Sequence, residues 1–417
     1  MGCASSHSMR DGVAKGRKKR KSSGIAMVAV FVSSLRVPVS VDLIGPMRGL
    51  VSRSLLDSVS ALRTRIGLLA DQRNLTVLPE LRHTLEEYLP ILLGLTKKDD
   101  LVEFKWRNLQ GDKQETSFTS TWYEVLSVIH LMAMLALLEA NKLLLPTDSP
   151  QLCVEASEDS KKNAIDLLLK ASGYLDYCVH HIMDHLSLQI RYSLPCDMQE
   201  GALEAISIQA LGQVLEIQLG LAAECEKASL SVIRRLACEE LSYFAQAHYC
   251  LLGCATDDYY GKKHQLFIKW KYLEAKAAAY YYHGLLLDKE TRPKDHIDAL
   301  NCFVASDKLL IESKKSCLHF CLAAPVTRVP PIRGLMKHLH KVTAEVASMK
   351  FQAYAYLLEQ EMDLQSIPEL PVFSLSLNPE DYNLPDIDPS WDTDEDDDER
   401  RQPVLQRLKD HLNDDDE

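Results

Sequence analysis

Glycine and proline are scarce in this sequence. Each accounts for 17 of the 417 residues, fewer than the many turns of an all-β protein require. Leu and Ala are abundant instead, and hydrophobic residues make up 46% of the chain. The composition therefore predicts a mostly α-helical protein that is long enough to bury a sizeable core.

The sequence also lacks a long apolar run. The longest, from Val125 to Leu138, includes His130 and is shorter than the roughly 20 residues that a membrane-spanning helix needs. The apolar run from Ile25 to Val32 follows basic residues, but no Ala-x-Ala cleavage pattern comes after it. We therefore expect neither a transmembrane helix nor a secretion signal.

Catalytic signatures are absent as well. The sequence contains no P-loop, no dinucleotide-binding glycine pattern after a strand, no G-x-S-x-G motif and no kinase signature. Its eleven cysteines lack the spacing of a disulfide framework. His181 and His185 have the i, i+4 spacing of two metal ligands, but structural or surface histidines explain them better. We expect reduced thiols in the cytoplasm, no catalytic residues, no metal, no cofactor and no enzyme activity.

Charge is concentrated at the two ends of the chain. Residues 1–24 carry seven Lys and Arg against one Asp, and residues 380–417 carry sixteen acids against four bases. The part between them lacks the excess of basic residues that a nucleic-acid-binding groove needs. We expect a disordered basic segment at 1–24, one domain at 25–390 and a disordered acidic tail at 391–417.

The first six residues, MGCASS, match a lipidation pattern. Gly2 and Ser6 fit the N-myristoylation motif, and Cys3 is a candidate for palmitoylation. One myristoyl chain binds a membrane only weakly, so stable anchoring needs a second signal. Six basic residues can add it by attraction to an anionic leaflet, namely Lys15, Arg17, Lys18, Lys19, Arg20 and Lys21. We expect a peripheral protein on the cytosolic face of the endosomal or plasma membrane.

The basic run also has a second interpretation. The sequence GRKKRK, from Gly16 to Lys21, is typical of a nuclear localisation signal too. In that case the chain would be a nuclear or cytosolic helical scaffold without an attached lipid.

Helical periodicity extends from about residue 47 to residue 362. Short connections favour antiparallel helical hairpins stacked in the tetratricopeptide style, although no strict repeat is present. Before this region, residues 31–43 predict one or two short strands. After it, recurring prolines predict an extended segment that Leu370, Phe373, Tyr382 and Trp391 hold against the body. The expected helices are 57–69, 79–95, 120–145, 160–188, 199–226, 229–252, 261–287, 294–314 and 331–362.

Two neighbouring helices of this set have unusual apolar faces. The helix at 199–226 carries two apolar stripes, so it lies between neighbours or lines a groove. In the helix at 229–252, Ile233, Ala237 and Phe244 belong to the stripe that faces the core. Val232 and Leu236 lie one turn apart on a different face, and such a pair can be a docking patch.

Several stretches, in order, resemble the Bro domain family of the Alix, Brox and rhophilin type. They are FVSSLRVPVSVDLIGP from Phe31, FKW from Phe104, YEVLSVIHLMAMLALLEA from Tyr123, GQVLEIQLGLAAECEKASLSVIRRLACEELSYF from Gly212 and KWKYLEAKAAAYYYHG from Lys269. The likeness covers about residues 30 to 390. In layout, with one Bro domain and short tails, the sequence is nearest to Brox, although it lacks Brox's C-terminal prenylation signal.

The resemblance implies an elongated, banana-shaped helical domain around a tetratricopeptide-like core, with a short N-terminal β-strand region. Family members hold the C-terminal amphipathic helix of an ESCRT-III subunit on a concave hydrophobic patch. By motif position, Leu219, Val232 and Leu236 match that patch, and helix-in-groove recognition needs apolar positions at one-turn spacing. We therefore expect a non-enzymatic, membrane-anchored adaptor of endosomal sorting.

Overall fold

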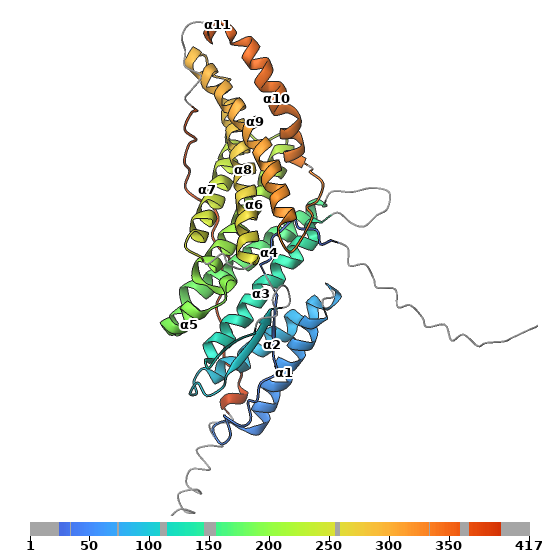
Figure 1. The fold of residues 1–417 in the computed structure, drawn as a ribbon, viewed down its shortest axis with the longest axis vertical. Helices are drawn as coiled ribbons and strands as arrows, with labels where there is room; N and C mark the ends of the chain where they lie inside the picture. The colour runs from blue at the N-terminus through green and yellow to red at the C-terminus, as the bar shows by residue number, and fades with distance from the viewer. Residues whose placement is uncertain are drawn as a thin grey trace, which may run out of the picture.

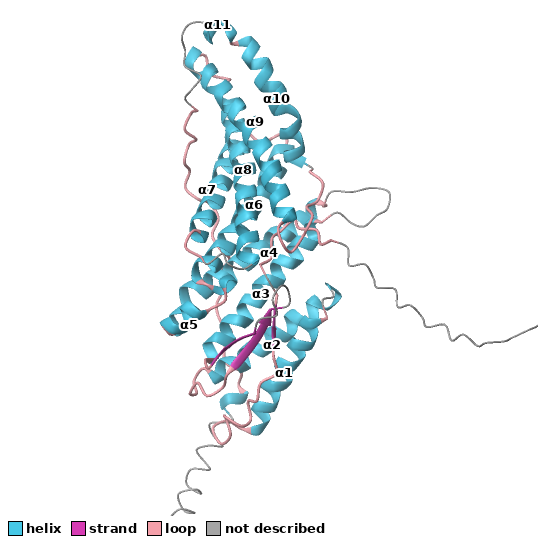
Figure 2. Cartoon of the chain, viewed as in Figure 1, coloured by secondary structure: helices cyan, strands magenta, loops and turns pink. Residues whose placement is uncertain are grey.

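A computed structural model of the chain describes residues 25–33, 35–72, 75–108, 115–145, 156–254, 259–332, 334–358 and 367–392. This part is mostly helical, as expected, with a small sheet near the N-terminus (Figure 2). The helices are α1 (Arg53–Asp71), α2 (Leu78–Leu95), α3 (Thr121–Leu144), α4 (Glu158–Tyr177), α5 (Leu188–Ser193), α6 (Glu200–Glu224), α7 (Leu230–Leu251), α8 (Tyr259–Leu287), α9 (Pro293–Leu322), α10 (Gly334–Ala353) and α11 (Ala355–Leu358). The strands are β1 (Arg36–Pro38), β2 (Phe104–Asn108) and β3 (Glu115–Phe118).

The helices form an elongated body, which confirms the expected architecture. The first two helices and the sheet lie at one end, and α10 and α11 lie at the other (Figure 1). Helices that follow each other in the chain, such as α6 and α7 or α8 and α9, pack side by side. This sequential packing is the helical-hairpin arrangement that the short connections predict.

One helix, α6, joins two hydrophobic cores. Leu203 and Val214 of α6 pack in a first core with α1 to α4. Leu219, nearer the end of α6, packs in a second core with α7 to α10. The two apolar stripes of this helix therefore face different cores, in agreement with its position between neighbours.

The sheet is antiparallel in the order β1-β2-β3. Val37 lies opposite Arg107 in the first pair, and Lys105 lies opposite Ser117 in the second. Strand β1 confirms the expectation for residues 31–43, and its Pro38 lies on an edge strand, where a missing N–H is tolerated. Strand β3 was not expected.

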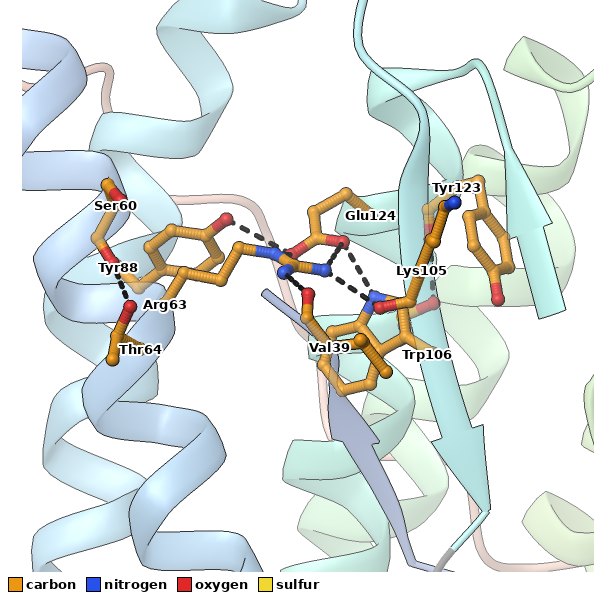
Figure 3. A network of polar contacts seen from close by, with 10 residues as sticks. Val39, Ser60, Arg63, Thr64, Tyr88, Lys105, Trp106, Tyr123 and Glu124 are labelled. Atoms are coloured by element: carbon orange, nitrogen blue, oxygen red, sulfur yellow. Dashed lines mark hydrogen bonds and ion pairs between the residues drawn. The ribbon is translucent and has the colours of Figure 1, made fainter. Parts of the chain in front are cut away.

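A buried ion pair ties the sheet to three helices. The Nε atom of Arg63, on α1, lies 2.9 Å from Oε1 of Glu124, on α3. Tyr88 of α2 donates a hydrogen bond to Glu124 Oε1 at 3.1 Å, and Trp106 of β2 donates to Oε2 at 2.6 Å (Figure 3). Arg63 also donates to two backbone carbonyl oxygens of the strand region. Because both charges are matched and hydrogen-bonded, losing one partner would cost about 3–5 kcal/mol of stability.

The helix expected at 160–188 is wrong in its second half. α4 ends at Tyr177, and a π-helical turn (Cys178–Ile182) and a 3₁₀ turn (Met183–His185) follow. Ser187 then accepts a hydrogen bond from the backbone N–H of Ile190 and caps the new helix α5. A serine at such a position starts a helix because its oxygen satisfies a free backbone donor.

The ends of two later helices also differ from expectation. α9 continues to Leu322, beyond the expected end at 314, and the helix expected at 331–362 is divided at Tyr354 into α10 and α11. Residues 359–362 of that expected helix lie outside the described part of the chain.

Residues 367–392, called the strap below, are extended for most of their length and run along the body. Leu370 and Phe373 pack beside the second core, and Tyr382 and Trp391 pack on the first. These contacts confirm the predicted extended segment. Trp391 is only 4% exposed, so the packed part of the chain reaches at least this residue.

Candidate partner-binding site

The first turn of α7 presents an apolar side chain to solvent. Ser229 caps this helix by accepting a hydrogen bond from the backbone N–H of Val232. The cap fixes the start of the helix and so fixes which residues face outward. Val232 is 50% exposed, whereas Ile233, the next residue, is buried in the second core.

Leu236 lies one turn beyond Val232 and is half-buried. It packs beside the second core and also beside a small cluster formed by Leu211, Leu215 and Tyr243. Val232 is therefore exposed to solvent and Leu236 is partly covered, and their role as a docking pair stays a prediction.

Leu219 does not share this surface. It is 1% exposed and belongs to the second core together with Ile233 and Ala237. The assignment of Leu219, Val232 and Leu236 to one partner-binding patch stays a prediction, in which Leu219 is the buried member. Two further apolar residues, Ala222 and Leu230, are half-buried beside the same core. We call Val232 and Leu236 the α7 patch.

Two arginines and the strap border the α7 patch. The guanidinium groups of Arg234 and Arg235 lie 5.7 and 6.0 Å from the centre of the Phe373 ring. Arg235 Nε also lies 2.6 Å from Oε1 of Glu239, whose side chain is buried. The strap therefore covers the side of α7 that carries Arg235 and Glu239, and it leaves Val232 exposed.

Hydrogen bonds hold the strap at this place. The Ser376 hydroxyl donates to Glu239 Oε2 at 2.5 Å, and the Ser376 N–H donates to the same oxygen at 3.1 Å. Tyr243 donates to the carbonyl of Leu377 at 2.7 Å and accepts from its N–H at 3.2 Å. No sequence pattern could pair Glu239 with Ser376, because 137 residues separate them.

The remaining site predictions concern the lipidation residues, the basic run and two histidines. Gly2, Cys3 and the basic residues Lys15, Arg17, Lys18, Lys19, Arg20 and Lys21 lie outside the described residues. His181 packs on Tyr177, and His185 stacks on Trp122. In the part of the chain that the structure describes, no group of His, Cys, Asp and Glu could hold a metal ion.

Two helices have the length and hydropathy of a membrane span. They are α3, whose most apolar window is 89% buried inside the protein, and α6, whose window is 61% buried. Both pack against other helices of the body, as core helices do.

Solved structures provide the comparison that identifies the fold. No protein-family profile matches the chain, and no curated protein matches it. A structure of ALIX in complex with the SIVmac239 PYKEVTEDL late domain aligns with a TM-score of 0.60 and 16% identity over 87% of this chain. The chain spans 50% of that ALIX chain. The chain has the Bro1 domain fold.

Two further structures span the whole Bro1 domain. One is a complex of the ALIX Bro1 domain with CHMP4C, with a TM-score of 0.58 and 16% identity, covering 86% of this chain and 99% of that chain. The other, described as the basis for endosomal targeting by the Bro1 domain, has a TM-score of 0.56 and 15% identity, covering 91% and 99%. The Bro1 fold confirms the resemblance found in the sequence, whereas the likeness in layout to Brox stays a prediction.

Proposed function

We propose that this protein is a non-enzymatic adaptor of endosomal sorting that binds the C-terminal amphipathic helix of an ESCRT-III subunit on the α7 patch. The acylated N-terminus and the basic run would hold it on the cytosolic face of an endosomal or plasma membrane. The alternative, a nuclear or cytosolic scaffold, rests on the same basic run and predicts no lipid.

The exposure of Val232 is the observation that carries the proposal. A valine that is half exposed on the first turn of a capped helix, with half-buried apolar neighbours, gains favourable burial only from a partner. An amphipathic helix places apolar side chains at one-turn intervals, which match Val232 and Leu236. The complex of the similar ALIX domain with CHMP4C supports this choice of partner.

A titration with the C-terminal helix of CHMP4C tests the proposal. Val232→Asp should weaken binding about 30-fold or more, because a carboxylate would be buried against an apolar partner. Tyr249→Asp is the matched control, since Tyr249 lies on the same helix and is 75% exposed. Circular dichroism would show that both variants keep their helices. Equal affinities for the unsubstituted chain and Val232→Asp would remove the α7 patch from the proposal.

A further inference from the structure

A cavity is lined by residues of α6 and of the helices packed on it, and Val232 is not among them. Its volume is about 610 Å³, within the range of small-molecule sites. Residues of α6, α8, α9 and α10 form most of its walls, Glu240 of α7 also lines it, and Val28 and Ala29 contribute from the N-terminal segment. Apolar walls dominate, and they include Ile217, Trp270 and Leu335.

A group of charged side chains is built into this apolar cavity. Lys271 Nζ lies 2.6 Å from Glu216 Oε1 and 3.3 Å from Glu274 Oε2. Burial alone would lower the pKa of Lys271, but the two carboxylates outweigh burial and raise it. The lysine is therefore charged and already engaged by two acids.

Glu240 is the third acid at this place, and it has no such partner. Its side chain lines the cavity, and the residue is 3% exposed. It makes no hydrogen bond or salt bridge with any described residue. Burial, and then the negative charge of Glu216, raise the pKa of Glu240 well above its usual range, although Lys271 acts in the opposite direction.

The other ionisable groups that line the cavity do not pair with the Glu240 carboxyl group. Lys161 pairs with Glu224 at 3.8 Å, and Lys314 is exposed. Burial lowers the pKa of His340 and raises that of Cys317 to about 12, so both are neutral at pH 7. Among the lining residues, the carboxyl groups of Glu216, Glu240 and Glu274 thus share the ammonium group of Lys271.

We propose that this cavity binds a small apolar molecule that carries one protonated amine. The ammonium group would lie against Glu240, and the apolar body would contact Trp270, Ile217 and Leu335. An anionic ligand would face three carboxyl groups, and a purely apolar ligand would leave the Glu240 carboxyl without a hydrogen bond, which costs free energy. A cationic head with an apolar body satisfies both requirements.

Binding of the amine should change the protonation of Glu240. Burial and the charge of Glu216 favour the protonated form of Glu240 in the empty cavity, whereas an arriving ammonium ion favours the carboxylate. Binding of the ammonium form then releases one proton from Glu240 to solvent. As the pH rises towards the raised pKa of Glu240, the affinity should therefore increase by up to about tenfold per pH unit, until the amine itself loses its proton.

Titration of the full chain with n-decylamine and n-decanol, each below its micellar concentration, tests the site. Trp270 gives a fluorescence signal because it lines the cavity. Decylamine should bind with a 1:1 stoichiometry and at least about tenfold more tightly than decanol. Equal affinities would overturn the proposal, as would decylamine binding without proton release in calorimetry performed in two buffers.

Glu240→Gln provides the second arm of the test. It keeps the side chain's shape but removes the negative charge, so it should weaken decylamine binding about tenfold and abolish proton release. Glu224→Gln, at the rim, should change the affinity less than twofold. If Glu240→Gln fails to fold, the pH dependence of the unsubstituted chain decides the question. Val232→Asp should bind decylamine normally, which separates this site from the α7 patch.

Discussion

Buried histidines are the residues whose protonation should govern stability in mild acid. His130 of α3 is fully buried, and neither of its ring nitrogens has a hydrogen-bond partner among the described residues. Burial lowers its pKa to about 4. Nε2 of His264, on α8, donates a hydrogen bond to Oε1 of Gln209 at 2.8 Å, and burial lowers the pKa of His264 to about 3. Both residues are neutral in the folded protein at pH 7.

The free energy of unfolding should therefore fall as the pH drops from about 6.5 to about 4. In this window the unfolded chain protonates His130 while the folded chain does not, so acid favours unfolding. The lowered pKa of His130 contributes about 3 kcal/mol to the free energy of unfolding, and this contribution is present in full above pH 6.5. Urea unfolding at several pH values would measure it.

His130→Leu supplies the control for that prediction. The variant keeps His264 and all acids, so the difference between the two pH curves isolates His130. Between pH 6.5 and 4, the free energy of unfolding of the variant should depend less steeply on pH, by the slope that corresponds to about one bound proton. Parallel curves would contradict the assignment.

Single residues were predictable where local pattern decides their position. The exposure of Val232 follows from helical period and the core stripe of α7, both visible in the sequence. The burial of Leu219 in the second core could not be predicted, because both faces of α6 are apolar and the helical period does not tell which face is covered. The isolation of Glu240 was not predictable, since it depends on Lys271 being engaged by Glu216 and Glu274.

At the scale of elements, the strap depends on two glycines of the helical body. A Cβ atom added to Gly173 of α4 would lie 2.0 Å from the carbonyl oxygen of Glu380. One added to Gly94 of α2 would lie 2.1 Å from the ring of Trp391. Such distances are far inside van der Waals contact, so only glycine allows the strap to lie this close.

Gly173→Ala should displace the strap and destabilise the protein by about 1–3 kcal/mol. The added Cβ atom would clash with the backbone of Glu380, which cannot move aside as a side chain does. Limited proteolysis should then cut within residues 367–392 faster than in the unsubstituted chain, and mass spectrometry would locate the cuts.

Gly220→Ala is the matched comparison. Gly220 also lies inside a helix, but a Cβ there meets nothing within 4 Å. Alanine should stabilise α6 by up to about 1 kcal/mol because it restricts the unfolded chain. If Gly173→Ala were as stable and as resistant to protease as Gly220→Ala, the strap would not need the close approach.

Long helices and the extended strap could be predicted, because period and proline content are local signals. Strand β3 could not, since its four residues are held by pairing with β2 rather than by their own pattern. The end of α4 was missed because apolar residues continue through the π-helical turn. Cys178, Ile182 and Met183 are all buried there.

At the scale of the whole molecule, the basic segment 1–24 and the acidic end give the chain opposite charges at its termini. A basic segment is attracted to an anionic membrane, whereas acidic residues are repelled by it. The proposed anchor would thus hold the molecule by one end of the chain.

Gly2→Ala should move the protein from the membrane fraction to the soluble fraction, because it removes the acylation site. Ser8→Ala, in the same segment but outside the motif, should leave the distribution unchanged. Fractionation followed by intact mass measurement would follow both location and lipid. An unchanged distribution for Gly2→Ala, without a myristate mass increment, would favour the nuclear or cytosolic scaffold.

The place of Trp391 has a consequence for synthesis of the chain. Its indole N–H donates to the carbonyl of Ile91 at 3.0 Å, and its ring packs in the first core. Ribosomes release the N-terminal part of a chain first, and domains often begin to fold while still attached. Here α2, one of the first helices to be synthesised, can pack against Trp391 only after 300 further residues have been added. A prematurely terminated chain would leave the space above Gly94 open, and this apolar gap is a surface that chaperones could recognise.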